Sequence, residues 1–334
     1  VYKQFRLTFG GKKWIYWLQQ HKNMEQNKIN RFLEYDLNKR LPFAWYLLGS
    51  MIVIIFSFVG QFPMLFFTSE ESTATMDPKN PMSMFTHLDA NLLLFLILFS
   101  FFIAFLGFLI VLKKMHSQSF ISVTTARTSI DIKRFFFGFI FWGGVVILTV
   151  LVDYFIFPQD YEITFQLTPF LIMFAISVIF IPIQSGLEEY LFRGYLMQGF
   201  AKLTKNRWMP LVLTSIIFGS LHIFNPEVEK LGMGILFYYI GTGFFFGIMT
   251  LMDEGIELAV GFHVANNLLT ALLVTADWTV FQTNSILKDI SEPSLWPQLI
   301  AALFLMYPIC LFVLARKYRW SNWKHKLTAT INES

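Results

Sequence analysis

Two histidines and a pair of adjacent glutamates lie inside long apolar stretches of this chain: His222, His263 and Glu188-Glu189. An ionisable side chain at the centre of a bilayer costs about 2.5–3.5 kcal/mol on insertion scales, so such residues are rare in membrane segments and usually functional. A carboxylate and two imidazoles that meet in one membrane cavity have the groups needed to activate water. These residues therefore indicate a buried hydrolytic site.

The first cluster runs from Glu188 to Arg193. Glu189 and Arg193 are four residues apart, so they share one face of a helix and are expected to form an ion pair. Glu188 lies about 100° around that helix and is left without this partner. We therefore expect Glu189 to orient the site and Glu188 to act as the general base. The alternative is a charged cluster at a helix end with no catalytic role.

The other two clusters are Phe218-x-x-x-His222 and His263-x-x-x-Asn267. Taken alone, a histidine near a helix end is more often a structural hydrogen-bonding group than a ligand. His263 and Asn267 are four residues apart and point to one side of their helix, where they are suited to binding an oxyanion or a metal. Polar side chains in membranes also hydrogen bond between helices without any catalytic role, and this alternative stays open.

Together the three clusters supply a base, a partner for it and an oxyanion stabiliser on three separate segments. No nucleophile elbow, His-Glu-x-x-His helix or phosphate-binding glycine loop competes with them.

The ordered trio Glu188-Glu189-x-x-x-Arg193, Phe218-x-x-x-His222 and His263-x-x-x-Asn267 resembles the signature of the CPBP intramembrane proteases. That family includes the CAAX prenyl endopeptidases and the bacterial Abi, or bacteriocin-immunity, proteins. The resemblance covers about residues 165–275. It implies about eight helices around a conical cavity that opens on one membrane face.

The resemblance also implies the roles of the residues. Glu188 would activate water with help from His222, and His263 and Asn267 would hold the oxyanion. The supporting residues would be Glu189, Arg193 and Phe218. If a divalent metal such as zinc is bound, its candidate ligands are Glu188, His222 and His263; metal-free, glutamate-activated water is the alternative.

The composition places these segments in a membrane. The chain has 334 residues, of which 55% are hydrophobic and only 14% charged, against about 25% charged in soluble domains. Apolar runs close to the ~20 residues that cross a bilayer predict an all-α, polytopic membrane protein with about eight transmembrane helices around a polar cavity. The predicted spans are 43–67, 91–112, 135–157, 167–187, 208–224, 232–252, 257–275 and 297–315.

The charges predict the topology. Residues 1–42, the loop 113–134 and the tail after the last span are basic, whereas the loop 68–90 is acidic. Because basic loops stay cytoplasmic, both termini are expected inside, most simply in a bacterial cytoplasmic (inner) membrane. The acidic turn 252–257 fits this topology poorly. No nucleic-acid-binding motif accompanies the basic residues, and a single cysteine, Cys310, excludes a disulfide within the chain.

The predicted spans and the charge pattern divide the chain into four regions. We predict a cytoplasmic or interfacial basic arm at 1–42, with no cleavable signal, and a transmembrane hairpin with an external loop at 43–134. A protease core is predicted at 135–320 and a cytoplasmic tail at 321–334. The apolar stretch 167–203 is too long for one straight span, so a helix break is expected at Pro182 and Gly186.

The expected depths of the two histidines disagree. His222 lies about 22 Å along its helix from Arg207, whereas His263 follows Glu257 closely and lies about a third as far in. A common depth therefore requires tilted or staggered helices.

The function predicted from the sequence is an intramembrane endopeptidase that acts on membrane-associated or CAAX-like peptides. One alternative is a non-catalytic immunity or scaffold protein of the same fold. Another is a transporter with a Glu–His proton relay, although no inverted repeat supports it.

Overall fold

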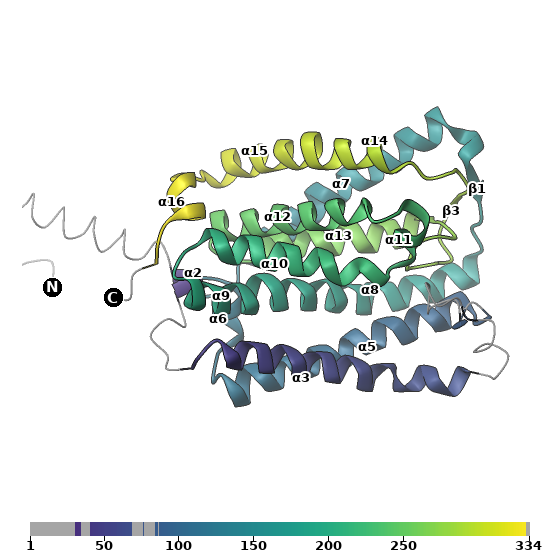
Figure 1. Ribbon diagram of the computed structural model, residues 1–334. Coiled ribbons are helices and arrows are strands. Elements are labelled where there is room, and N and C mark those ends of the chain that lie inside the picture. Colours follow the sequence, from purple (N-terminus) through teal and green to yellow (C-terminus); the bar gives the residue numbers. More distant parts are fainter. Residues whose placement is uncertain (1–30, 35–40, 69–75, 77–83, 86, 332–334) are drawn as a thin grey trace, which may run out of the picture.

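The protein is a bundle of long apolar helices with almost no sheet (Figure 1). The computed structural model describes residues 31–34, 41–68, 76, 84–85 and 87–331. Most of the predicted arm 1–42 and of the predicted loop 68–90 lies outside these residues. In the described part of the chain, six helices are long and apolar enough to cross a membrane. The all-α, polytopic prediction is confirmed, and the protein is an integral membrane protein.

All eight predicted spans are helical, but two are short. The six long spans are Ala44–Phe67 (starting with α3, Ala44–Gln61), Ala90–Met115 (α5, Ala90–Ile110), Ile132–Ile156 (α7), Leu167–Thr204 (starting with α8, Leu167–Glu189), Ile235–Asp253 (α12) and Leu295–Tyr318 (α14, Leu295–Ile300, and α15, Tyr307–Tyr318). The shorter ones are Trp208–Phe224, which contains α10 (Trp208–Ser220), and α13 (Glu257–Leu273).

Helix α13, which carries His263 and Asn267, lies at the centre and packs on α7, α8 and α12. Its contact with α7 is close because glycine faces backbone there. A side chain at Gly261 would place its first carbon 2.2 Å from the carbonyl oxygen of Phe135. Small residues of this kind let membrane helices approach closely, so the position of α13 against α7 depends on them. On the other side, α3 packs on α5 and α5 packs on α8.

The expected break at Pro182 is wrong. Helix α8 runs through Pro182 and Gly186 to Glu189 without interruption. A proline removes one backbone hydrogen bond, and packing of α5 and α13 against α8 accompanies the continuous helix here. The irregularity comes later, as a π-helical segment over Tyr190–Leu196, before α9 (Met197–Thr204). A π-bulge shifts the faces of a helix and is frequent at functional sites.

The acidic turn between α12 and α13 lies inside the fold. Arg127 contacts Glu257 (Nη2–Oε2, 2.8 Å) and Asp253 (Nη2–Oδ2, 3.2 Å), and Arg134 also pairs with Asp253. Helix α16 (Trp323–Thr328) packs on α12 at the same end. Glu257 is therefore buried in the fold rather than exposed in a loop. His222 and His263 lie at different distances along their helices but line the same cavity. Arginines neutralise the acids of this turn.

A small sheet lies at the opposite end of the bundle, in the order β1-β3-β2 (Figure 1). Strand β1 (Tyr161–Ile163) is antiparallel to β3 (Leu287–Asp289), with Tyr161 opposite Asp289. Strand β2 (Val274–Thr275) directly follows α13 and runs parallel to β3. The predicted span 257–275 thus ends as a strand. This sheet was not predicted.

Candidate active site

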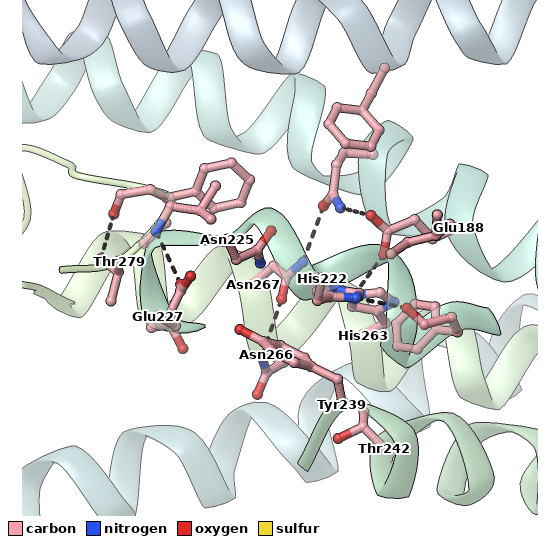
Figure 2. A pocket seen from close by; sticks show the side chains of 18 of the residues that line it. Glu188, His222, Asn225, Glu227, Tyr239, Thr242, His263, Asn266, Asn267 and Thr279 are labelled. Atoms are coloured by element: carbon pink, nitrogen blue, oxygen red, sulfur yellow. Dashed lines mark hydrogen bonds and ion pairs between the residues drawn. The ribbon is translucent and has the colours of Figure 1, made fainter. Parts of the chain in front are cut away.

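The predicted site residues line one cavity of about 620 Å³ (Figure 2). Its wall includes Glu188 from α8, His222 from the turn after α10, and His263 and Asn267 from α13. Phe218 also lines it, whereas Glu189 and Arg193 are fully buried behind it. The structure therefore brings the three sequence clusters together around a common space.

Glu189 and Arg193 form the predicted ion pair, which is confirmed. Arg193 Nη1 lies 3.0 Å from Glu189 Oε1, and both side chains are 0% exposed. Breaking a pair this deeply buried leaves an uncompensated charge, so each partner depends on the other. The guanidinium also lies 4.2 Å from the ring centroid of Phe218, which gives Phe218 a supporting contact at the site.

Glu189 contacts His263 as well. The Nδ1 atom of His263 lies 2.8 Å from Glu189 Oε1, and the imidazole stacks on Phe246. Because a carboxylate only accepts hydrogen bonds, Nδ1 is the donor in this contact. The ring is thereby fixed with Nε2 on the side of Glu188. The sequence predicted an orienting role for Glu189 but did not identify His263 as the residue that it orients.

Glu188 is the carboxylate of the pair that reaches the cavity, with 18% of its side chain exposed. Gln184 Nε2 donates to its Oε1 at 2.6 Å, and its Oε2 lies 3.6 Å from His263 Nε2. These contacts hold the carboxylate from two sides. When His263 is neutral, Nε2 is an acceptor that faces another acceptor, so a proton placed between the two atoms satisfies both.

His222 lies just beyond α10, in the 3₁₀ turn Leu221–Phe224. Its Nδ1 donates to the carbonyl oxygen of Phe218 (2.8 Å), which leaves Nε2 as the free ring nitrogen. The imidazole stacks on Tyr239, with ring centroids 4.1 Å apart. Among the described residues, His222 and Glu188 share the cavity but are not hydrogen bonded to each other.

Asn267 belongs to a chain of amides that ends at Glu188 (Figure 2). Its Nδ2 donates to Gln184 Oε1 (3.1 Å) and to Ser185 Oγ (3.2 Å), and its Oδ1 accepts from Asn266. Trp142 in turn donates to Asn266. Both protons of the Asn267 amide are therefore used within the protein in this arrangement.

Four residues of the site were not predicted from the sequence: Gln184, Ser185, Asn266 and Trp142. For Gln184 a signal existed, because it lies four residues before Glu188 on the same helix face. For Trp142 none existed, because the packing of α7 on α13 brings it to Asn266 across 124 residues of sequence.

The donor types of Glu188, His222 and His263 suit zinc. In the part of the chain that the structure describes, however, no group of three or more His, Cys, Asp or Glu side chains is arranged to hold a metal ion. The three residues therefore do not form a ready ligand set in this arrangement, and metal binding stays a prediction.

Comparison with known proteins bears on the same region. Residues 166–269 match the family described as Type II CAAX prenyl endopeptidase Rce1-like. The chain is also 33% identical over 179 residues to the uncharacterized protein YyaK of Bacillus subtilis (strain 168), a match that covers 52% of this chain and 59% of that protein. The chain thus spans less than two thirds of this relative's length. No solved structure matches the chain.

Proposed function

This chain belongs, through residues 166–269, to the CAAX protease (CPBP) family, and on that premise we propose that it is an intramembrane endopeptidase. Its proposed reaction is hydrolysis of a peptide bond in a membrane-associated or CAAX-like peptide. The observation that carries the proposal is Glu188: a carboxylate open to the cavity and held between Gln184 and His263. Such a group is placed to remove a proton from water.

In the proposed reaction, Glu188 takes a proton from a water molecule, and the hydroxide attacks the carbonyl carbon of the scissile bond. The carbonyl oxygen becomes an oxyanion, and Glu188 then passes its proton to the leaving nitrogen as the C–N bond breaks. The free Nε2 of His222 faces the same cavity and is suited to accept the second hydrogen of the water, which aligns it for attack.

His263 is the proposed oxyanion donor. For Nε2 to donate while Nδ1 donates to Glu189, the ring has to carry both protons when the oxyanion forms. Asn267 is the second candidate for this role. It would have to release Gln184 or Ser185 to reach the oxyanion, because both of its donor protons are engaged. We therefore assign His263 the larger share.

A bound zinc ion would polarise the carbonyl and acidify water. Glu188, His222 and His263 would be its candidate ligands.

The proposed orientation follows the charges. The end of the bundle with Arg127, Arg134 and the basic C-terminal segment is placed at the cytoplasmic face, with both termini inside a bacterial cytoplasmic membrane. The protease core 135–320 then presents its cavity within the bilayer. The lipid bilayer is the environment of the protein, and a peptide is its proposed substrate.

The test is comparative proteomics of cells that express the wild type, Glu188→Gln or Glu229→Gln. Glu229 is an exposed carboxylate on α11 (Pro226–Leu231) and serves as the matched control. An uncleaved precursor is expected to accumulate with Glu188→Gln only, at unchanged protein level. If cells with the wild type, Glu188→Gln and Glu229→Gln contain the same peptides, the endopeptidase proposal fails. If Glu188→Gln in addition still protects the cells or binds a partner, the non-catalytic immunity or scaffold alternative is correct.

A further inference from the structure

One arm of the cavity extends from Glu188 towards the small sheet. The walls of this arm come from Asn225 and Glu227 after α10 and from the segment 274–281 after α13. Elsewhere the cavity is also lined by residues of α3 and α5: Val53, Ile54, Ser57, Ile97, Phe101 and Ala104. Figure 2 shows Glu227 and Thr279 on the far side of Asn267 from His263. In the other direction the site is closed by side chains that are at most 5% exposed: Glu189, Phe192, Arg193, Phe218 and Phe246. This arm of the cavity therefore leads from the site towards the sheet end of the bundle.

That end is acidic. In the described ranges it carries Asp89, Asp160, Glu162, Glu227, Glu229, Asp277, Asp289 and Glu292 against Lys230 and Lys288. Both lysines are already paired: Lys230 with Glu292 (2.9 Å) and Lys288 with Asp277 (2.9 Å). The remaining carboxylates leave this end with a net negative charge, and two of them, Glu227 and Asp289, line the cavity. A field of this sign concentrates cations and repels anions.

Glu227 carries negative charge into the cavity wall itself. Its Oε1 accepts a hydrogen bond from the Val280 backbone nitrogen (3.0 Å), whereas Oε2 is buried without a partner in the described residues. No lysine or arginine there pairs with it, and burial raises the pKa of the Glu227 carboxyl. A cation that arrives beside this group offsets the cost of burying it.

A second polar atom of the wall is also unsatisfied. The Nε1 atom of Trp278 is buried and has no acceptor among the described residues. A carboxylate oxygen without a donor and an indole N–H without an acceptor would both be satisfied by a peptide that brings an ammonium or guanidinium group and a backbone carbonyl.

We infer that the protein takes its substrate from the acidic, sheet-bearing end and selects peptides that carry positive charge, with Glu227 as the residue that contacts the lysine, arginine or free amino terminus. The inference rests on the proposed endopeptidase function and specifies its substrate class. Under the proposed orientation, this end faces away from the cytoplasm, so the substrate is an extracytoplasmic or membrane-inserted cationic peptide.

The experiment uses the full-length protein in proteoliposomes and two synthetic quenched-fluorescent peptides. Both have the same apolar centre, and their flanks contain three lysines in one peptide and three glutamines in the other. The lysine peptide is expected to have about a tenfold higher kcat/KM, and this preference is expected to shrink in about 0.5 M salt. Glu227→Gln is expected to remove most of the preference by raising KM for the lysine peptide at unchanged kcat.

Glu162→Gln is the matched control, because it removes the same charge from the exposed face of β1 without touching the cavity wall. It is expected to change the preference less than about twofold. Equal kcat/KM for the two peptides in the wild type, or an unchanged preference in Glu227→Gln, overturns the inference and leaves the proposed function standing. If the wild type cleaves neither peptide faster than Glu188→Gln does, both fail.

The side of entry is tested with the same lysine peptide added outside spheroplasts or outside inverted membrane vesicles. Cleavage above the Glu188→Gln background is expected with spheroplasts. Cleavage confined to inverted vesicles overturns the inference.

Discussion

The two ends of the helical bundle treat buried carboxylates in opposite ways. At the basic end, the side chains of Asp253 and Glu257 are at most 2% exposed, and arginine side chains pair with both. At the cavity end, Glu188 and Glu227 have no lysine or arginine partner among the described residues. Burial of an unpaired ion is unfavourable at both ends. The arginine pairs offset this cost for Asp253 and Glu257, whereas no lysine or arginine among the described residues offsets it for Glu188 and Glu227.

We interpret the difference as one between carboxylates that stabilise the fold and carboxylates that act on or bind the substrate. Arg127 and Arg134, which neutralise Asp253 and Glu257, lie outside residues 166–269, the region that matches the protease family. Through Arg127, the segment 116–134 therefore holds Glu257 at the start of α13, the helix that carries His263. Glu188 and Glu227, which have no lysine or arginine partner among the described residues, lie inside the matched region and line the cavity.

The largest effect is expected from Glu188→Gln. It keeps the size of the side chain and removes the base, so kcat is expected to fall at least about 10³-fold. The melting temperature in detergent is expected to stay within ~2 °C of the wild type, because no lysine or arginine loses a partner. Peptide cleavage in proteoliposomes and thermal melts measure the two quantities. A large loss of melting temperature would place Glu188 with the carboxylates that hold the fold.

Arg127→Met is expected to show the reverse pattern. It leaves Glu257 without an arginine partner and Asp253 with Arg134 as its remaining arginine partner. The expected loss is about 2–3 kcal/mol of stability. This is below the full value for a buried pair because the Arg127 side chain is 27% exposed. The melt of the purified protein measures the change. Arg316→Met, in an exposed side chain on α15, is the matched control and is expected to be neutral. Equal melts for both variants would contradict the structural role of the basic end.

Gln184→Leu is expected to have an intermediate effect. Its amide donates to Glu188 and accepts from Asn267, so its loss frees the carboxylate to rotate. We expect kcat to fall about tenfold to thirtyfold at unchanged KM, because a misplaced base affects the transition state more than binding. Steady-state kinetics distinguish this from a structural defect, and Gln184→Glu, which cannot donate when ionised, is expected to behave like the leucine variant. A change confined to KM would contradict the positioning role.

Much of this arrangement could be predicted from the sequence, because local rules determine it. Apolar runs of about 20 residues predicted the spans, and spacing of four residues predicted the Glu189–Arg193 pair. What failed was long-range or depended on packing. Pro182 does not break α8, and the Asp253–Glu257 turn lies inside the fold because of arginines more than 100 residues away. No sequence pattern reports such pairings without the fold.

The smallest effect is expected in the melting temperature of Glu227→Gln, and it depends on pH. Burial raises the pKa of Glu227 in the folded protein, so the folded state holds the proton more tightly than the unfolded state does. Wild-type stability is therefore reduced as pH rises from the unfolded carboxyl pKa through the higher folded value, and the reduction is constant above it. Glu227→Gln removes this term and is expected to melt slightly higher than the wild type at pH 8 but not at pH 4.

Glu257→Gln provides the opposite case, because it deprives Arg127 of one of its two carboxylate partners and is expected to melt lower than the wild type at pH 8. Melts of both variants at the two pH values measure the difference. If Glu227→Gln melts lower as well, Glu227 stabilises the fold through a partner, and the two ends of the bundle do not differ in kind. If the signs are opposite, the protein retains an unfavourable carboxylate in its cavity wall at the expense of stability, as expected for a group whose partner is the substrate.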